Sequence, residues 1–327
     1  MRRIALSPTD FVLSFLVLGG LSLLPLWVRS EYWLGILITA VYFAMLAVSW
    51  NLLAGIAGLF SMAPAAFAMV GAYTTGLLHH HGGLGPLVGI PAGVLVSALI
   101  GFALGRVTLR LRGAYLALTT LAFAEILRLV IANSIEITRG DLGLSVSGIF
   151  GGAKIPTLYL FLGVLGAYQL VLVWLLRTRA GLYFRAIRDD ELGAMGRGVD
   201  VVRYKTLAFS VSSAGCGLAG ALFVHFLQLA SPEMGLILQT GLVISMVVIG
   251  GMGTATGPLV GAVLVEVASE ALRVVGVRHM LVFALVVILI GRFFRDGLVG
   301  LVARLGRRPL PGAAPVPAAA EEGAGRR

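Results

Sequence analysis

Of the 327 residues, 58% are hydrophobic and only 12% are charged. With the 44 glycines included, the apolar share reaches about 71%, whereas soluble domains have about 45–50% apolar and about 25% charged residues. A soluble protein of this size has too much surface for so few charges, so the composition excludes a water-soluble enzyme and indicates a multi-pass protein of the lipid bilayer. The net charge of +10 is spread between apolar stretches, which is typical of membrane topology signals and argues against nucleic acid as a partner.

Ten apolar stretches come close to the roughly 20 residues that a bilayer-spanning helix needs. In chain order they are 11–28, 33–54, 61–78, 84–105, 113–132, 156–176, 206–228, 236–250, 257–272 and 279–293. Because 236–250 and 257–272 are short, we expect an all-α bundle with eight to ten crossings. Arg2 and Arg3 are also typical of a signal peptide, but a charged segment follows the first stretch in place of a small-residue cleavage site, so we expect a retained helix.

The distribution of lysine and arginine predicts on which side the loops lie. With ten crossings and a cytoplasmic N-terminus, Arg128 falls within a span and the external side receives Arg29, Arg139, Lys154, Arg273 and Arg278. The other 19 of the 25 basic residues fall on the cytoplasmic side. Because positive charge accumulates in cytoplasmic loops, both termini are predicted to be cytoplasmic.

The segments outside the spans suggest a single domain with a tail. Residues 133–155 are expected to form an external loop, and residues 177–205 form the longest charged cytoplasmic segment. We therefore expect residues 1–308 to be one transmembrane domain. Residues 309–327 are rich in proline and alanine without an apolar period, so they are expected to be a disordered tail.

Glycines recur four residues apart in several stretches, which would place them on one face of a helix. The stretches contain Gly89 and Gly93, then Gly101 and Gly105, and finally Gly253, Gly257 and Gly261. Small residues let helix backbones approach closely in lipid, so a tightly packed bundle is predicted.

The charged segment 177–205 carries the pattern of a short amphipathic helix at a water-exposed surface. Leu182, Ile187, Leu192 and Met195 follow helical spacing and are expected to share an apolar side, and the helix is expected to end at Gly196–Gly198. Such a helix between two spans has the shape to dock into a groove on a partner protein. From the residues alone, an ordinary polar loop that fixes topology is the competing interpretation.

This segment resembles the coupling loop of ABC-importer permeases, and more closely that of the branched-chain amino acid permease family of the LivM type. The matching residues are Asp190, Glu191, Ala194, Gly198, Val201, Arg203, Tyr204, Lys205, Ala208 and Phe209. Two positions depart from the pattern, since Gly193 replaces a usual alanine and Arg197 replaces a usual apolar residue. Glycine loosens a helix by up to roughly 1 kcal/mol relative to alanine, which affects the docking geometry.

Three further stretches carry the same resemblance, and together they cover most of the chain from about 33 to 295. The first is Leu109–Tyr115 with Thr119, Leu121–Phe123, Glu125 and Ile126; the second is Trp50–Gly55 with Gly58, Ser61, Phe67 and Gly71–Tyr73; the third is Gly250–Gly253 with Gly257, Pro258, Gly261 and Ala262. In the second motif, Ala63–Pro64 replaces the usual polar element.

The resemblance implies a permease subunit of an ATP-driven importer for branched-chain amino acids or related small polar substrates, in a bacterial inner membrane. It implies a second permease chain, cytoplasmic ATP-binding subunits and an extracytoplasmic substrate-binding protein as partners, and no cofactor. The ATP-binding subunits would dock around Arg188, Asp190, Glu191, Ala194 and Gly198. The sequence itself agrees that ATP would bind to partner chains. Its only lysines, Lys154 and Lys205, do not lie in a Walker A loop, so no nucleotide site of that kind is predicted in this chain.

Charged residues within the expected spans leave two interpretations open. Glu125 and Arg128 lie three residues apart, hence on one face, where they either line a substrate path or form a structural ion pair. With Glu266 and Glu270, Glu125 would also supply the carboxylates of an ion-coupled secondary transporter, which is the alternative function. An intramembrane enzyme is disfavoured, since the sequence contains neither H-E-x-x-H nor G-x-S-x-G, and no catalytic residue is predicted.

Metal binding is not predicted. Cys216 is the single cysteine and cannot form a multi-thiolate site. His79–His81 resemble a metal-binding tract but are followed by two glycines, and we expect a solvated loop. His225 is expected to pack within the bundle.

Overall fold

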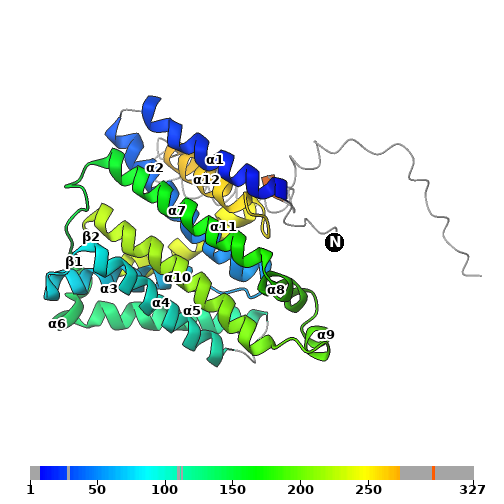
Figure 1. Ribbon diagram of the computed structural model, residues 1–327. Coiled ribbons are helices and arrows are strands. Elements are labelled where there is room, and N and C mark those ends of the chain that lie inside the picture. The colour runs from blue at the N-terminus through cyan, green and yellow to red at the C-terminus, as the bar shows by residue number, and fades with distance from the viewer. Residues whose placement is uncertain (1–7, 28–29, 109–110, 112, 273–296, 299–327) are drawn as a thin grey trace, which may run out of the picture.

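A computed structural model describes residues 8–27, 30–108, 111, 113–272 and 297–298 (Figure 1). Its α-helices are α1 (Pro8–Trp27), α2 (Glu31–Trp50), α3 (Pro64–Gly82), α4 (Pro86–Val107), α5 (Ala114–Asn133), α6 (Ile135–Thr138), α7 (Lys154–Arg177), α8 (Arg179–Asp189), α9 (Glu191–Gly196), α10 (Val201–Leu227), α11 (Ile237–Gly250) and α12 (Gly257–Leu272). The π-helix η1 (Asn51–Ile56) continues α2, and short 3-10 helices are η2 (Gly140–Leu142) and η3 (Pro232–Gly235). The strands β1 (Leu144–Ser145) and β2 (Leu229–Ala230) complete the elements.

The long helices form a bundle with two distinct ends (Figure 1). One end carries α8 and α9, and we call it the coupling end. The other carries the antiparallel pair β1–β2, in which Leu144 is opposite Ala230, and we call it the sheet end. Arg177, which ends α7, lies 5.8 Å over the ring of Phe11 near the start of α1, so α1 begins at the coupling end.

The predicted helical bundle is confirmed, and nine of the ten predicted spans correspond to helices within the described residues. Five segments are long and apolar enough to cross a bilayer by length and composition: Glu31–Ile56, Pro86–Val107, Ala114–Asn133, Lys154–Arg177 and Val201–Leu227. The apolar parts of α1 and α11 are shorter. The tenth span, 279–293, and the tail 309–327 lie outside the described residues, so the number of crossings remains a prediction.

The helices differ in how much of their apolar surface is buried, and this separates a centre from a periphery. Of the residues in the most apolar stretch of each helix, 89% are buried in α2 with η1 and 72% in α10, but only 22% in α4 and 22% in α5. The buried face of α3 packs between α4 and α10. Central helices are therefore surrounded by protein, and α4 and α5 present apolar side chains outward, as a membrane-facing helix does.

Close glycine contacts hold α3, α4 and α10 together, as the sequence predicted for α4. A Cβ atom at Gly93 would lie 2.8 Å from the carbonyl oxygen of Gly71, and one at Gly105 would lie 2.9 Å from Cβ of Phe209. The prediction for Gly253 is wrong, because this residue has φ +82° and lies in the loop before α12 rather than on its helical face. Gly257 and Gly261 do pack closely, against α11.

Substituting Gly220 by leucine is expected to destabilise the bundle strongly. A Cβ atom there would lie 1.9 Å from the backbone oxygen of Ala68, and backbone cannot yield as a flexible side chain does. Overpacking a core costs about 1–3 kcal/mol and occasionally more, and we expect at least the upper value. Gly166→Leu on α7 is the matched control, since no atom lies within 4 Å of its added Cβ. Thermal unfolding in detergent can be monitored as the loss of the folded peak in size-exclusion chromatography. The unfolding temperature should fall strongly for the Gly220 variant and change little for Gly166→Leu.

Candidate functional site

The charged segment 177–205 forms two short helices, and the prediction of a single helix is wrong. The chain is extended at Asp190 (φ −156°, ψ 105°), which ends α8 and begins α9. This interruption breaks the helical spacing, so Leu192 and Met195 do not share the buried side of Ile187. Ile187 is 6% exposed, whereas Leu182, Leu192 and Met195 are 62%, 66% and 54% exposed. Three large apolar side chains therefore lie on the surface of the coupling end.

The glycines of this segment differ in whether their surroundings require glycine. A Cβ atom at Gly193 would lie 2.4 Å from Oδ2 of Asp190, an exposed side chain that can move aside, so this contact alone does not require glycine. Gly198 has φ +80°, and the N–H groups of Gly198 and Val199 donate to the carbonyls of Met195 and Ala194. This is a Schellman termination, which favours glycine at the left-handed position.

Two of the predicted coupling residues hold α9 against the bundle. The Glu191 carboxylate accepts a hydrogen bond from Nζ of Lys205 at 2.6 Å, with side chains 18% and 5% exposed. Ala194 is buried with Ile187 and Val201 in a small apolar cluster. Glu191 and Ala194 thus set the position of α9, whereas Asp190 is exposed.

Replacing Lys205 by methionine is expected to loosen α9, because a hydrogen bond between two charged groups contributes about 1.5–3 kcal/mol. Limited proteolysis of the 189–199 segment in native membranes should become faster. The reversed pair Glu191→Lys with Lys205→Glu should restore most of the protection, and unchanged protection in Lys205→Met would show that the pair does not hold α9.

Arg188 connects the coupling segment to the bundle. Its Nη1 donates a hydrogen bond to the carbonyl oxygen of Gly55 in η1, and its stem packs on Gly58, which has φ +75°. A π-helix changes the hydrogen-bond register, and such segments occur frequently at functional sites. The guanidinium of Arg188 thus satisfies a carbonyl at the end of a transmembrane helix.

The same junction includes the loop between α11 and α12. Asn51 donates through Nδ2 to the carbonyl of Thr254 at 2.8 Å and accepts through Oδ1 from the N–H of Gly253 at 2.7 Å. Asp10 of α1 accepts from the N–H of Ala255 at 2.7 Å and from Oγ1 of Thr256 at 2.6 Å. Two of the sequence motifs, at 50–55 and 250–253, therefore meet where Arg188 binds. Asn51 belongs to the motif Trp50–Gly55, whereas no sequence pattern pointed to Asp10 as part of this junction.

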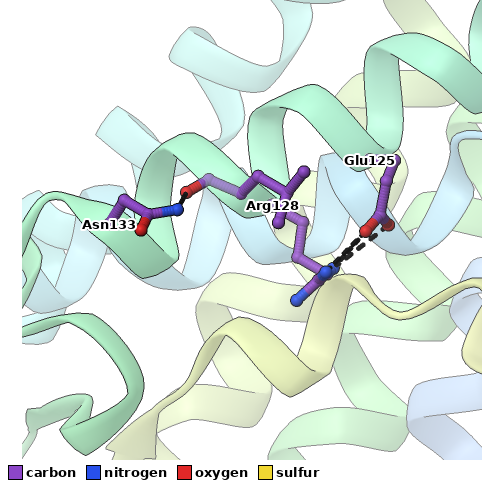
Figure 2. Close-up of polar contacts among 4 residues, drawn as sticks. Glu125, Arg128 and Asn133 are labelled. Carbon is purple, nitrogen blue, oxygen red and sulfur yellow. Dashed lines mark hydrogen bonds and ion pairs between the residues drawn. The ribbon is translucent and has the colours of Figure 1, made fainter.

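Glu125 and Arg128 form the predicted pair on α5, and Figure 2 shows their side chains meeting on one side of this helix. Nε of Arg128 donates to Oε2 of Glu125 at 3.1 Å, and Nη2 donates to Oε1. The side chain of Arg128 is 20% exposed and that of Glu125 is 44% exposed. Asn133, one turn farther along, donates to the backbone of Leu129 and does not join the pair (Figure 2).

The remaining polar candidates lie toward the sheet end. Glu270 of α12 accepts a hydrogen bond from the hydroxyl of Tyr32. Nδ1 of His225, a buried residue, lies 2.8 Å from the carbonyl of Ser147. His79–His81 form the last turn of α3 rather than a loop. Within the described residues, no group of three His, Cys, Asp or Glu side chains is placed to hold a metal ion.

Comparison with known proteins decides the family. Residues 32–291 match the family described as the branched-chain amino acid transport system / permease component. The chain belongs to this family. It is 35% identical over 264 residues to the high-affinity branched-chain amino acid transport system permease protein LivM of Salmonella typhimurium, and 34% identical over 265 residues to LivM of Escherichia coli; each alignment covers 72% of this chain. It is also 22% identical over 268 residues to the permease LivH of Escherichia coli, covering 76% of this chain and 86% of LivH.

The alignments with the two LivM proteins span 62% of each relative's length. The family match over residues 32–291 contains α2 to α12, the coupling segment and the residues Gly55, Asn51 and Arg188 of the junction. The relatives are transport permeases by name, and the helical bundle agrees with a multi-pass membrane protein of that kind.

Proposed function

We propose that this chain is the permease subunit of an ATP-binding cassette importer that moves branched-chain amino acids or related small polar substrates across a bacterial inner membrane. The family match carries the proposal, because it spans α2 to α12 together with the coupling segment. The relatives' names supply the substrate class.

In this proposal the coupling end lies in the cytoplasm, together with the chain termini. The asymmetry of basic residues supports this orientation. Residues 1–308 act as one transmembrane domain, and 309–327 form a tail. The sheet end, with β1, β2 and residues 133–155, then faces an extracytoplasmic substrate-binding protein.

Cytoplasmic ATP-binding subunits would dock on the surface of α8 and α9. This assignment is supported by Leu182, Leu192 and Met195, whose side chains are each more than half exposed. Apolar side chains exposed at a water-facing end are stabilised when a partner buries them. Asp190 is exposed beside them, and Glu191, Ala194 and Gly198 fix the shape that is presented. ATP hydrolysis would occur on those subunits.

A second permease chain would complete the path. The relation to both LivM and LivH, two permeases of the same named system, supports a heterodimer of similar chains. Glu125 and Arg128 would then line the path between them or its edge.

The junction around Arg188 suggests how ATP-driven closure would reach the helices. Movement of α8 would act through Arg188 on Gly55, and through Asn51 on the loop at Gly253. In this region α2 ends and α12 begins, so a displacement there would change how these two helices pack. ATP can shift the access state only by binding one state more tightly than the other.

Purification of the tagged chain from its native membrane in mild detergent, with mass spectrometry of the bound proteins, tests the assignment. ATP-binding subunits and a second permease should be recovered with it. Recovery of the chain alone, from preparations in which a known heteromeric permease retains its partners, would contradict the proposal.

A further inference from the structure

The pair Glu125–Arg128 lies deep within its helix rather than at an end. Glu125 is about 16 Å along α5 from Ala114 and about 12 Å from Asn133, at 1.5 Å per residue. Its carboxylate side chain is 44% exposed in the isolated chain. A charge that faces hydrocarbon at this depth is costly, so intramembrane charges face a partner or a water-filled cavity. Pairing with Arg128 meets part of this cost, and we expect the exposed part of the Glu125 carboxylate to face a polar space rather than lipid.

A break between two helices lies beside the pair. A Cβ atom at Gly235 of η3 would lie 3.6 Å from Cγ of Arg128, and α11 begins two residues later at Ile237. Figure 2 shows the pale yellow ribbon of this segment passing beneath the pair. The side of the pair occupied by Arg128 is thus also the side on which α11 begins.

The start of α11 is an uncapped helix N-terminus. No side chain caps it, and within the described residues the backbone N–H groups of Ile237 and Leu238 have no acceptor. Both residues are about half exposed, at 51% and 49%. A helix N-terminus carries a partial positive charge and binds carboxylates, and interrupted helices use it in this way in other transporters. Positive potential from Arg128 and α11 therefore adjoins the negative Glu125.

A buried hydroxyl without a partner gives independent support. Tyr73 is 3% exposed, and its hydroxyl has no hydrogen-bond partner among the described residues. It lies one helical turn beyond Met69, whose Sδ would be 2.6 Å from a Cβ at Gly235. Asp141 is close enough to act electrostatically on both Tyr73 and Arg128. A buried polar group rarely stays unpaired, so this region has capacity for a further polar group.

We propose that α5 and the start of α11 form a subsite for an amino-acid zwitterion. Its ammonium would pair with Glu125, and its carboxylate would pair with Arg128 and the free N–H groups at the start of α11. The inference rests on the proposed function and adds the residues that recognise the substrate. A zwitterion fits this arrangement, because its ammonium and its carboxylate would each meet a group of opposite charge.

The first experiment measures uptake of [14C]leucine and ATP hydrolysis by the complete complex in proteoliposomes, with saturating binding protein. Glu125→Gln and Arg128→Gln should each lower uptake at least about tenfold, because each removes a charged hydrogen bond to the substrate, while ATP hydrolysis continues. Glu31→Gln is the matched control, since it removes the exposed ion pair with Lys154 at 3.6 Å and should leave uptake unchanged.

The reversed pair Glu125→Arg with Arg128→Glu distinguishes recognition from a structural role. It keeps an ion pair at the same spacing but places the negative charge beside the start of α11, so uptake should stay low. Restored uptake would show that the pair is structural and would overturn the subsite, as would unchanged uptake in both single variants. Failure of the unsubstituted complex to accumulate leucine with ATP would instead overturn the proposed function.

Cysteine labelling tests the chemistry of the ligand without the binding protein. Leu129 lies four residues after Glu125 and is 45% exposed, and the native Cys216 is buried. In the permease–ATPase complex, Leu129→Cys should react with a water-soluble maleimide, and millimolar leucine should slow the reaction. Isoamylamine, which lacks the carboxylate, and 4-methylpentanoate, which lacks the ammonium, should not slow it. Absence of labelling, or equal protection by all three, would contradict a zwitterion subsite.

Discussion

Leu192→Glu is expected to remove the ATP-binding subunits from the purified complex. Leu192 is 66% exposed at the coupling end, and a docked partner would enclose it. A carboxylate forced into an apolar contact without a partner costs several kcal/mol, so we expect at least about a 100-fold loss of affinity. The amount of ATP-binding subunit that copurifies with the tagged chain measures this loss.

A matched substitution at the opposite end controls for general damage to the protein. Leu229 is 42% exposed in β2 at the sheet end, and Leu229→Glu should retain the ATP-binding subunits. Both variants should elute as unaggregated protein in detergent. Normal recovery of the subunits with Leu192→Glu would exclude the exposed surface of α9 from the docking site.

Arg188→Gln is expected to separate ATP hydrolysis from transport. The complex should assemble, because the apolar docking side chains are unchanged. Uptake should fall about 10- to 100-fold, because the charged hydrogen bond to the carbonyl of Gly55 is lost. Without this bond, a movement of α8 would no longer displace the end of α2. ATP hydrolysis should persist, so the number of ATP molecules hydrolysed per substrate should rise.

Arg197→Gln provides the comparison for this variant. Arg197 belongs to the same charged segment and is exposed, so the loss of one positive charge is matched. Its uptake should remain close to normal. Normal uptake by Arg188→Gln, with an unchanged number of ATP molecules hydrolysed per substrate, would mean that the contact with Gly55 does not transmit movement.

The sequence predicted the bundle because long apolar stretches separated by basic loops have few alternative structures. α4 (Pro86–Val107) and α7 (Lys154–Arg177) each lie within about two residues of the predicted spans at both ends. The pair Glu125–Arg128 was also predictable, since residues three apart on a helix are neighbours.

The contacts that organise the coupling end could not be predicted from local patterns. Arg188 and Gly55 are 133 residues apart, and Asp10 and Ala255 are 245 residues apart, so their contact depends on helix packing. The break at Asp190 was missed because the apolar residues on both sides of it keep helical spacing in the sequence. The backbone at Asp190 is nevertheless extended, which separates α8 from α9. Resemblance to the family located the motifs at 50–55 and 250–253, but only the fold shows that they meet.

The most direct test of the account is uptake of [14C]leucine into proteoliposomes that contain this chain, the second permease and the ATP-binding subunits. We expect accumulation that requires both ATP and the substrate-binding protein and that is insensitive to dissipation of ion gradients. Accumulation by the chain alone, driven by a proton or sodium gradient without ATP, would contradict the importer assignment and identify an ion-coupled transporter.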